Sequence, residues 1–406
     1  MGDTPPAITL DDVQQARERL RGHIYGSPCP KSLAFSRSLE LTAYFKLENL
    51  QQTGSFKERG ALNRLEALSP EERARGVVAA SAGNHAQGVA YNARQLGIPA
   101  FIVMPVGTPL TKVKNTRSFE AEVVLKGSNY DEAFEFASEV AREQDRVLIH
   151  AFDDPRIIAG QGTIGLELLE QVPDLDAVVV PVGGGGLIGG VATAIKSLRP
   201  QVRVIGVQTE ALPAMRQSLS AGEVVLLPPA ITIADGIAVK RPGRLTFPLV
   251  QRYVDEVVTV SDEEIAAAIL LLLEREKTLA EGAGAAALAA VHYRKVDLTG
   301  KRVVMLVSGG NIDMTFLSRV IERGLAHDGR LAELHIKIED RPGSLAKLTS
   351  LLGVLQGNIL QISHNRAFGH VNLGQTELSV SLETRGQDHV EEILTALREQ
   401  GYAVER

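Results

Sequence analysis

The sequence predicts an α/β protein whose body consists of doubly wound, mostly parallel sheets in two lobes, followed by a smaller domain of different topology. From Thr42 to Gly310, short β-branched runs alternate with helical patterns, which is typical of parallel strands covered by helices on both faces. After Ile321 the order of elements changes. The length of 406 residues also exceeds what one hydrophobic core usually organises.

Eight segments of the body are predicted strands, because each is a short apolar run bounded by turn residues. They are Gly76–Ala80, Ala100–Met104, Ala121–Leu125, Val147–His150, Ala177–Val182, Arg203–Gln208, Glu256–Val260 and Arg302–Val307. The helical patterns between them include Ala86–Leu96, Tyr130–Glu143, Glu263–Glu276 and Ala283–His292. Since crossovers between parallel strands are right-handed, this order predicts helices on both faces of each sheet.

The tail reads as βαββαβ, the order of a ferredoxin-like module. Its predicted elements are Glu333–Glu339, Ser344–Gln356, Ile359–Arg366, Gln375–Glu383, Asp388–Gln400 and Tyr402–Glu405. The polar stretch Glu322–Arg330 precedes them. We therefore expect a linker at 326–332, between a body of residues 1–325 and a tail of residues 333–406.

Composition and charge exclude several classes of protein. With 44% hydrophobic and 23% charged residues, the chain is neither disordered nor fibrous. The net charge of −6 argues against a nucleic-acid or anionic-membrane surface. Cys29 is the only cysteine, which rules out an internal disulfide and a Cys-based zinc cluster and suits a reducing compartment.

Targeting and membrane signals are also weak. The N-terminus lacks the basic start and apolar core of a signal peptide, so a cytoplasmic protein is expected. The uncharged stretch Ala177–Ile195 contains Pro181 and several glycines. This content predicts a strand, a turn and a helix start rather than a membrane span.

The 38 glycines of the chain are concentrated in turns that follow predicted strands. Three such turns are Ser81–His85, Gly183–Gly186 and Ser308–Asn311. The carboxyl ends of parallel strands face one crevice, so we expect the three turns to converge on one ligand site. Tight backbone turns alone would explain any one of them, but they explain four consecutive glycines poorly.

The turn Gly183–Gly186 predicts a phosphate cradle, because bare amide N–H groups at a helix start bind anions. Which phosphate it binds stays open at this point. The spacing of Gly184, Gly186 and Gly189 also satisfies the dinucleotide pattern, and Glu210 stands where a ribose-binding acid would be expected. An NAD-binding protein is therefore a competing reading.

Lys57 separates the two readings. Ser55 and Glu58 match a capping box, which predicts that Lys57 lies in the first turn of a helix. A cation there opposes the helix dipole, so the neutral amine is favoured and becomes a better nucleophile. A lone lysine is usually a solvated surface residue. Beside a phosphate cradle, however, such an amine is what a pyridoxal phosphate Schiff base requires.

These motifs resemble a known family, the threonine dehydratases (threonine ammonia-lyases), which are pyridoxal-phosphate enzymes of the tryptophan-synthase-β-like fold (fold type II). Ser55–Ala61 resembles the family's cofactor-lysine motif, Ser81–Gly88 its substrate loop and Gly183–Leu187 its phosphate loop. The resemblance covers nearly the whole chain and implies a small lobe of about residues 50–150 inserted in the catalytic domain.

The resemblance also implies a role for each site residue. Lys57 would form the Schiff base and act as the catalytic base, and Phe56 would pack near the cofactor ring. Asn84 would bond the cofactor's phenolic oxygen, and Ser308 would face its pyridine nitrogen. The substrate carboxylate would be held by the turn formed by Ser81, Ala82, Gly83, Asn84 and His85. The cofactor phosphate would be held by Gly183, Gly184, Gly185, Gly186 and Leu187.

The implied reaction is dehydration and deamination of L-threonine to 2-oxobutyrate and ammonia, and of L-serine to pyruvate, by β-elimination. The pathway, isoleucine biosynthesis or threonine breakdown, stays open. Dehydration of 3-hydroxyaspartate or another hydroxyamino acid is the nearest alternative. Serine racemisation and an NAD-dependent oxidoreductase are further alternatives, and a non-catalytic amino-acid sensor would require the surroundings of Lys57 to be accidental.

Two departures narrow the choice. Similar serine racemases carry a second serine at the position of Ala82, so racemisation should be weak. They also bind a divalent cation near the position of Glu210, where the companion residue here is Arg216, so no metal site is expected. A monovalent cation near Glu281 is implied by the resemblance, although a carboxylate at a helix N-terminus is an equal reading.

The remaining histidines and the tail support separate expectations. We expect three of these histidines to be surface residues or core residues with hydrogen-bond partners: His150, His292 and His335. Asp340, Pro342, Gly343 and Ser344 resemble the ligand loop of an ACT domain, which implies an amino-acid effector. A structural turn with Ser344 as N-cap is an equal reading. The resemblance further implies a homodimer or homotetramer.

Overall fold

The computed structural model describes residues 6–365 and 372–406. Its contacts divide the chain into two compact units, which meet in the sequence between Ile312 and Asp313. Each unit contains its own hydrophobic core. They are therefore described separately.

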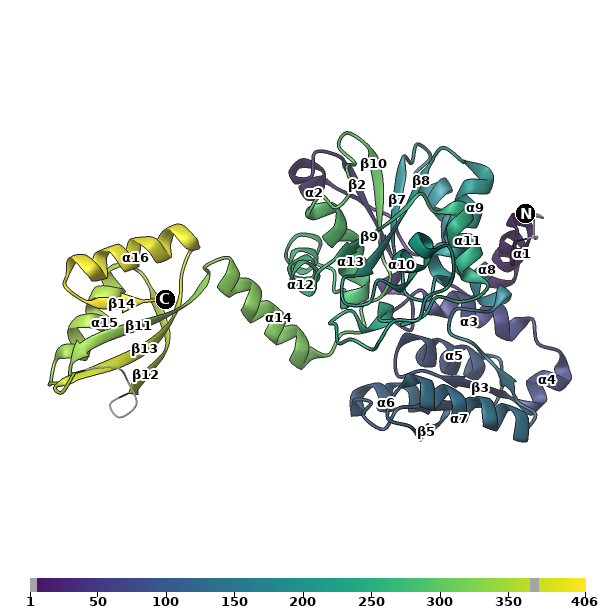
Figure 1. Ribbon diagram of the computed structural model, residues 1–406, viewed down its shortest axis with the longest axis horizontal. Coiled ribbons are helices and arrows are strands. Elements are labelled where there is room, and N and C mark those ends of the chain that lie inside the picture. Colours follow the sequence, from purple (N-terminus) through teal and green to yellow (C-terminus); the bar gives the residue numbers. More distant parts are fainter. Residues whose placement is uncertain (1–5, 366–371) are drawn as a thin grey trace. The chain divides into compact units, whose positions relative to one another are not determined.

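A six-stranded sheet forms the centre of the first unit, with the order β1-β2-β10-β7-β8-β9 (Figure 1). The strands are β1 (Lys31–Ser32), β2 (Thr42–Leu47), β7 (Ala177–Pro181), β8 (Arg203–Thr209), β9 (Glu256–Val260) and β10 (Arg302–Val307). All pairs are parallel except β1 with β2. Strand β10 lies between β2 and β7, where Met305 is in register with Phe45 and Val179.

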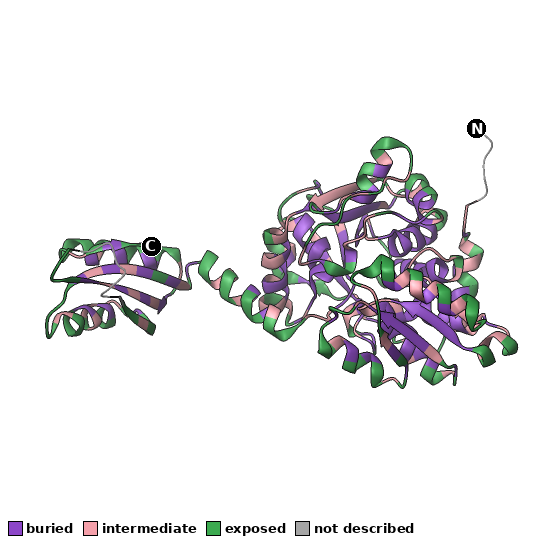
Figure 2. Cartoon of the chain, turned by 60° about the horizontal axis from the view of Figure 1, so that its bottom comes forward, coloured by how far each residue is buried: buried purple, intermediate pink, exposed green. Residues whose placement is uncertain are grey.

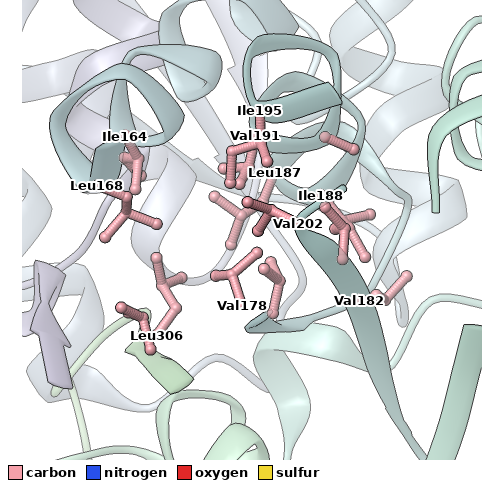
Figure 3. Close-up of a cluster of buried hydrophobic side chains, with 14 of the residues drawn as sticks. Ile164, Leu168, Val178, Val182, Leu187, Ile188, Val191, Ile195, Val202 and Leu306 are labelled. Carbon is pink, nitrogen blue, oxygen red and sulfur yellow. The ribbon is translucent and has the colours of Figure 1, made fainter. Parts of the chain in front are cut away.

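Helices cover this sheet because its strands are apolar on both faces. Every residue of β7 is buried, the pattern expected of a parallel strand between two helical layers. Figure 3 shows one of the resulting contacts, in which Val178 and Leu306 lie below Ile164 and Leu168 of α8 (Pro155–Gln171) and Val191 of α9 (Gly186–Leu198). The remaining helical segments of this part of the unit are α1 (Leu10–Leu20), α2 (Leu33–Ser38), η1 (Glu48–Leu50), α3 (Lys57–Glu66), α10 (Ala214–Ala221), η2 (Asp235–Ile237), α11 (Thr246–Tyr253), α12 (Asp262–Leu271), η3 (Leu272–Glu276) and α13 (Gly282–His292).

A second, four-stranded parallel sheet with the order β5-β4-β3-β6 forms the smaller lobe of the same unit. Its elements are β3 (Val77–Ala80), β4 (Ala100–Met104), β5 (Glu122–Leu125), β6 (Val147–Leu148), α4 (Pro70–Arg75), α5 (Asn84–Gln95), α6 (Leu110–Arg117) and α7 (Tyr130–Glu143). Alternate residues of β3 face opposite layers: Val77 packs with Val89 of α5, and Val78 packs with Ala133 of α7. Both sheets thus carry helices on two faces, which confirms the predicted doubly wound class.

The second unit is a four-stranded antiparallel sheet with the order β12-β13-β11-β14. Its elements are α14 (Met314–His327), β11 (Leu331–Glu339), α15 (Ser344–Val354), β12 (Asn358–Asn365), β13 (Gln375–Glu383), α16 (Gln387–Glu399) and β14 (Ala403–Glu405). From β11 onwards this is the predicted βαββαβ order. Leu334, Leu348 and Leu394 meet in its core.

Two predictions about the chain need correction. The expected linker at 326–332 is not an open segment, because helix α14 continues to His327 and β11 begins at Leu331. The strand β2 is absent from the predicted set. Its sequence contains Lys46, whose charge argues for an exposed loop, yet this side chain is fully buried and its Nζ contacts Glu167 Oε2 at 2.5 Å.

The apolar stretch Ala177–Ile195 forms β7, a glycine turn and the start of α9, as expected. Within the described ranges, none of the helices is long and apolar enough to cross a membrane. Figure 2 shows that the buried residues lie mainly in the strands and that the exposed residues lie on the outer sides of the helices.

Candidate active site

A cavity of about 600 Å³ lies in the first unit at the carboxyl ends of strands from both sheets. The turns after β3, β7 and β10 contribute Asn84, Gly184 and Ser308 to its wall, so the three turns converge as predicted. All the residues expected to bind cofactor or substrate line this one cavity: Phe56, Lys57, Ser81, Ala82, Gly83, Asn84, His85, Gly183, Gly184, Gly185, Gly186, Leu187 and Ser308.

Lys57 is the first residue of α3, but the predicted capping box is wrong. The N-cap residue is Phe56, which makes no side-chain cap. Ser55 Oγ is buried without a hydrogen-bond partner, and Glu58 Oε2 accepts from the backbone N–H of Thr53 at 2.9 Å. The reason is tertiary, because Phe56 N donates to Ser308 O at 3.1 Å and ties this segment to the turn after β10.

Lys57 is partly buried and lines the cavity. Its Nζ donates to Ala151 O at 2.7 Å and lies 5.3 Å from the centre of the Phe56 ring. Burial lowers the pKa of Lys57 to about 8, and the nearby carboxylate of Glu281 opposes this shift. The neutral, nucleophilic amine is therefore more populated near neutral pH than in an ordinary lysine.

The segment Gly183–Gly186 forms a cradle whose glycines are required by packing. A Cβ on Gly184 would overlap the ring of Phe152, and one on Gly186 would stand 2.9 Å from the carbonyl oxygen of Phe152. Gly185 is the N-cap of α9 with a positive φ of 95° and offers no side chain to the helix. The first N–H groups of α9 thus remain available to an anion in the cavity.

The turn Ser81–His85 leads from β3 into α5. Gly83 N donates to Ser81 Oγ at 3.1 Å, which tightens the turn. His85 Nε2 lies 2.9 Å from Ile149 O, and since a carbonyl only accepts, this nitrogen carries the proton. Burial lowers the pKa of His85 to about 3, so the ring is neutral and anchors the turn.

A buried network of ion pairs is formed by Arg59, which lies in the same helix as Lys57. Arg59, two residues further along α3, donates from Nε and Nη2 to both oxygens of Glu48 at 2.8 Å. Its Nη1 contacts Glu167 Oε1 at 2.5 Å, and Glu167 also receives Lys46. Although burial opposes it, the Arg59 guanidinium holds the pKa of Glu48 below its usual range. The network fixes the beginning of α3 to α8 and η1.

The sequence did not indicate several other residues of the cavity wall. His150 was expected to be a core or surface residue but lines the cavity between the rings of Phe134 and Phe152, at centroid distances of 5.4 and 4.7 Å. Its Nδ1 accepts from Asp153 N at 2.8 Å. The available signal was its position as the last residue of the predicted strand Val147–His150, because ligands bind at the carboxyl ends of parallel strands.

Charged residues from opposite sides of the cavity are also paired across it. Lys112 Nζ of α6 lies 2.8 Å from Asp235 Oδ2 of η2, and Lys240 contacts Asp131 of α7. These four residues line the cavity. Both of these lysines therefore already have a carboxylate partner.

Like His150, Glu281 lines the cavity although it was not among the predicted cofactor or substrate residues. It is 5% exposed, and its Oε1 accepts a hydrogen bond of 2.7 Å from Asn84 Nδ2 inside the cavity. Burial, reinforced by Asp235, raises the pKa of Glu281 to about 8.

Glu210 and Arg216 lie elsewhere, at a shallower depression of about 530 Å³. Glu210 faces Lys295 at 3.8 Å, and Arg216 Nη1 donates to Thr259 Oγ1 at 3.0 Å. No group of three or more His, Cys, Asp or Glu side chains is placed to hold a metal ion in the part of the chain that the structure describes.

Comparison with known proteins agrees with this geometry. Residues 20–309 match the family model described as pyridoxal-phosphate dependent enzyme. The L-threonine ammonia-lyase of Thermotoga maritima is 50% identical over 98% of this chain and 99% of that protein, and the catabolic L-threonine dehydratase TdcB of Escherichia coli K12 is 47% identical over 77% and 96%.

Solved structures show the same relationship. A threonine deaminase from the source abbreviated T.th. has a TM-score of 0.71 at 42% identity, covering 76% of this chain and 99% of that one. Maize serine racemase has a TM-score of 0.75 at 36% identity over 79% and 99%. With more than half of its length matched by the family model and near-full-length relatives at 50% identity, the chain belongs to the family of pyridoxal-phosphate-dependent enzymes.

Proposed function

We propose that this protein is an L-threonine ammonia-lyase that converts L-threonine to 2-oxobutyrate and ammonia and also accepts L-serine. The observation that carries the proposal is the presence of the Lys57 amine and the Gly183–Gly186 cradle in one cavity. Because the pKa of Lys57 is lowered to about 8, its neutral amine, which is the nucleophilic form, is more populated than in an ordinary lysine. Relatives named as threonine ammonia-lyases at 50% identity support the same reaction.

The residues present fit pyridoxal phosphate. The cradle is packed so tightly that a Cβ at Gly184 or Gly186 would collide with Phe152. Leu187 and the free N–H groups of α9 would hold the phosphate, and Lys57 Nζ would bond the aldehyde carbon. Phe56 would lie along the ring, and Asn84 and Ser308 would bond its phenolic oxygen and pyridine nitrogen. Bound there, the cofactor supplies an electron sink for the carbanion at the amino acid's α-carbon.

The chain's own groups perform the remaining tasks. When the substrate amine takes its place, the Lys57 amine is free to remove the proton from the substrate α-carbon. The N–H groups of the turn Ser81–His85 would orient the carboxylate. His85 is neutral and hydrogen-bonded to Ile149, so it holds the turn and leaves the proton transfer to Lys57.

Besides Lys57, the cavity wall contains three cationic side chains that bear on the choice between neutral and dicarboxylic hydroxyamino acids: Lys112, Lys240 and Arg241. Lys112 and Lys240 are already paired with Asp235 and Asp131, so a second substrate carboxylate would be recognised by Arg241. Ala82 lines the cavity at the position where the similar racemases carry a serine, so racemisation should be weak. A panel of threonine, serine and 3-hydroxyaspartate, followed by release of 2-oxo acid, tests the substrate.

Replacing Lys57 tests the assignment of the cofactor lysine. The purified protein should absorb at ~410–420 nm and lose this band on borohydride reduction. Lys57→Ala should lose both the band and turnover. A Lys57→Ala protein that turns over threonine at the wild-type rate would refute the assignment, and a wild-type protein with no such band would refute the proposed function.

We further propose that the second unit is an ACT-like regulatory domain. Gly343 is the N-cap of α15 with a φ of 89°, and no side chain caps this helix, so its N–H groups are available to an amino-acid carboxylate. Ser344 is the first helical residue, which removes the reading of Ser344 as N-cap. Asp340 and Pro342 lie in the same turn.

Calorimetry on the full chain with isoleucine, valine, threonine and serine tests the effector. Heat with a kinetic response to one of them is expected, and no response to any would leave this unit a packing role only. A cytoplasmic homodimer or homotetramer completes the proposal, and sedimentation of the purified protein measures its mass.

A further inference from the structure

Glu281 occupies a capping position without acting as a cap. It is the N-cap residue of α13, yet its side chain makes no hydrogen bond to that helix. The carboxylate instead turns into the cavity, where Oε1 accepts from Asn84 at 2.7 Å. A carboxylate at a helix start is normally stabilised by the free backbone N–H groups of the first helical turn. Because the Glu281 carboxylate bonds Asn84 instead of its own helix, we infer that it has a function in the cavity.

The contact belongs to a chain of hydrogen bonds with a defined direction. Asn311 Nδ2 donates to Thr53 O at 2.7 Å and to Asn84 Oδ1 at 2.8 Å. A backbone carbonyl can only accept, so the Thr53 oxygen fixes which end of the Asn311 amide is the donor. Asn84 must then accept through Oδ1 and present Nδ2 to Glu281.

We propose that Glu281 is a positioning residue for the cofactor, because its Oε1 and the Asn311 amide together hold the Asn84 amide in the one orientation that leaves the second N–H of Nδ2 for the cofactor's phenolic oxygen. A flipped amide would face Glu281 with Oδ1 and Asn311 with Nδ2. Two acceptors would then meet at one end and two donors at the other. Oε1 can accept this hydrogen bond both in the carboxylate and when the carboxyl proton sits on Oε2, although the carboxylate is the stronger acceptor.

Burial raises the pKa of Glu281, and the charges around the carboxyl group act on that pKa in both directions. Asp235 raises the pKa of Glu281 beyond the effect of burial, while Lys112 and Lys57 lower it. The positioning role needs only an acceptor at Oε1. A glutamine at this position therefore preserves it, since the amide oxygen accepts in the same place.

The experiment measures pyridoxal phosphate binding to the protein stripped of cofactor, and it rests on the proposed function. Glu281→Leu keeps the volume and removes the acceptor, so the dissociation constant should rise about tenfold, the effect of one aligned hydrogen bond. The absorbance maximum of the bound cofactor should also shift. Glu281→Gln should bind within about twofold of wild type.

A double-mutant cycle with Asn84→Ala tests whether Glu281 acts through Asn84. In that background Glu281→Leu should change the dissociation constant by less than about twofold, since the group it positions is gone. Glu264→Leu serves as the matched control, because this carboxylate caps α12 outside the cavity and should leave binding unchanged. Asn311→Leu releases the Asn84 amide from its other end and should weaken binding similarly, which keeps the test available if Glu281→Leu does not fold.

Two results would overturn the proposal: wild-type affinity in Glu281→Leu, or effects of Glu281→Leu and Asn84→Ala that simply add. Failure of the proposed function looks different. In that case the wild-type protein itself would not bind pyridoxal phosphate with a band at ~410–420 nm.

Discussion

Gly309 lies directly against the carboxylate of Glu281, and a Cβ built on Gly309 would stand 2.5 Å from Glu281 Oε1. The same Cβ would be 3.2 Å from Asn84 Nδ2. The absence of a side chain at position 309 is therefore what allows the Glu281–Asn84 hydrogen bond to form.

Gly309→Ala should displace the Glu281 carboxylate and weaken the bond to Asn84. Because the nearest atom is the end of a flexible side chain, the cost to stability should stay near the lower end of overpacking effects, about 1 kcal/mol. The dissociation constant for pyridoxal phosphate should rise about tenfold. Equilibrium unfolding and cofactor titration measure the two effects. Adding Gly309→Ala to Glu281→Ala should cost no further affinity, and an additional loss would contradict this explanation.

The rate at which cofactor-free protein recombines with pyridoxal phosphate should depend on the protonation of Lys57. Only the neutral amine attacks, so the rate should rise about tenfold per pH unit below 8 and level off above it. Glu281 raises the pKa of Lys57, so Glu281→Gln should move the midpoint to lower pH. Stopped-flow absorbance follows the reaction, and a flat profile between pH 6 and about 9 would count against a titrating Lys57.

The stability of the cofactor-free protein should have a local minimum near pH 8. The folded pKa of Glu281 is raised from 4.5 to about 8, so the folded state holds a proton that the unfolded chain has lost, and stability falls between these values. The folded pKa of Lys57 is lowered from 10.5 to about 8, so stability rises again above pH 8. Urea unfolding of the wild type and of the Lys57→Met/Glu281→Gln double variant across this pH range measures the contribution of the two groups to the free energy of unfolding. The variant should be more stable at pH 8 by about 1–3 kcal/mol, and equal stability would contradict the prediction.

Gly184→Ala should damage both packing and cofactor binding. The added methyl group overlaps the Phe152 ring, so either the ring or the cradle must move. We expect a loss of about 1–3 kcal/mol in the free energy of unfolding and at least about a tenfold weaker affinity for pyridoxal phosphate. Gly107→Ala is the control, since a Cβ at Gly107 meets nothing within 4 Å. Unchanged affinity in Gly184→Ala would argue against the cradle.

Arg59→Met should destabilise the protein strongly. Arg59 is 1% exposed, and its removal leaves the carboxylates of Glu48 and Glu167 without their main cationic partner. Breaking such a buried pair costs about 3–5 kcal/mol. Adding Glu48→Gln should recover part of the loss by removing one unpaired charge. Denaturant unfolding provides the measurement, and a loss within experimental error would show that water reaches the network.

Elements whose pattern reflects local physics were predictable. The strand β13 was placed at its observed bounds because polar and apolar residues alternate along Gln375–Glu383. The convergence of the three glycine turns followed from a general property of parallel sheets. Lys57 was placed in a first turn, although for a mistaken local reason.

The features that were missed depend on tertiary contacts. Lys46 looks like a surface residue until Glu167, far away in the chain, neutralises it. Ser55 has the residue type of an N-cap, but the bond from Phe56 N to Ser308 O moves the helix start by one position. The role of Glu281 depends on Asn84, which is separated from it by most of the catalytic unit. No local pattern contains such pairings.

The central position of β10 has a consequence for synthesis of the protein. This strand is the last of its sheet in the sequence, yet it hydrogen-bonds to β2 on one side and β7 on the other. Until residue 307 has left the ribosome, β2 and β7 both present open edges, which are templates for pairing with other chains. The four-stranded sheet, encoded between Val77 and Leu148, is under no such constraint. The nascent chain therefore carries a finished lobe and an unfinished one through much of its elongation, and the unfinished lobe is where a chaperone would be needed.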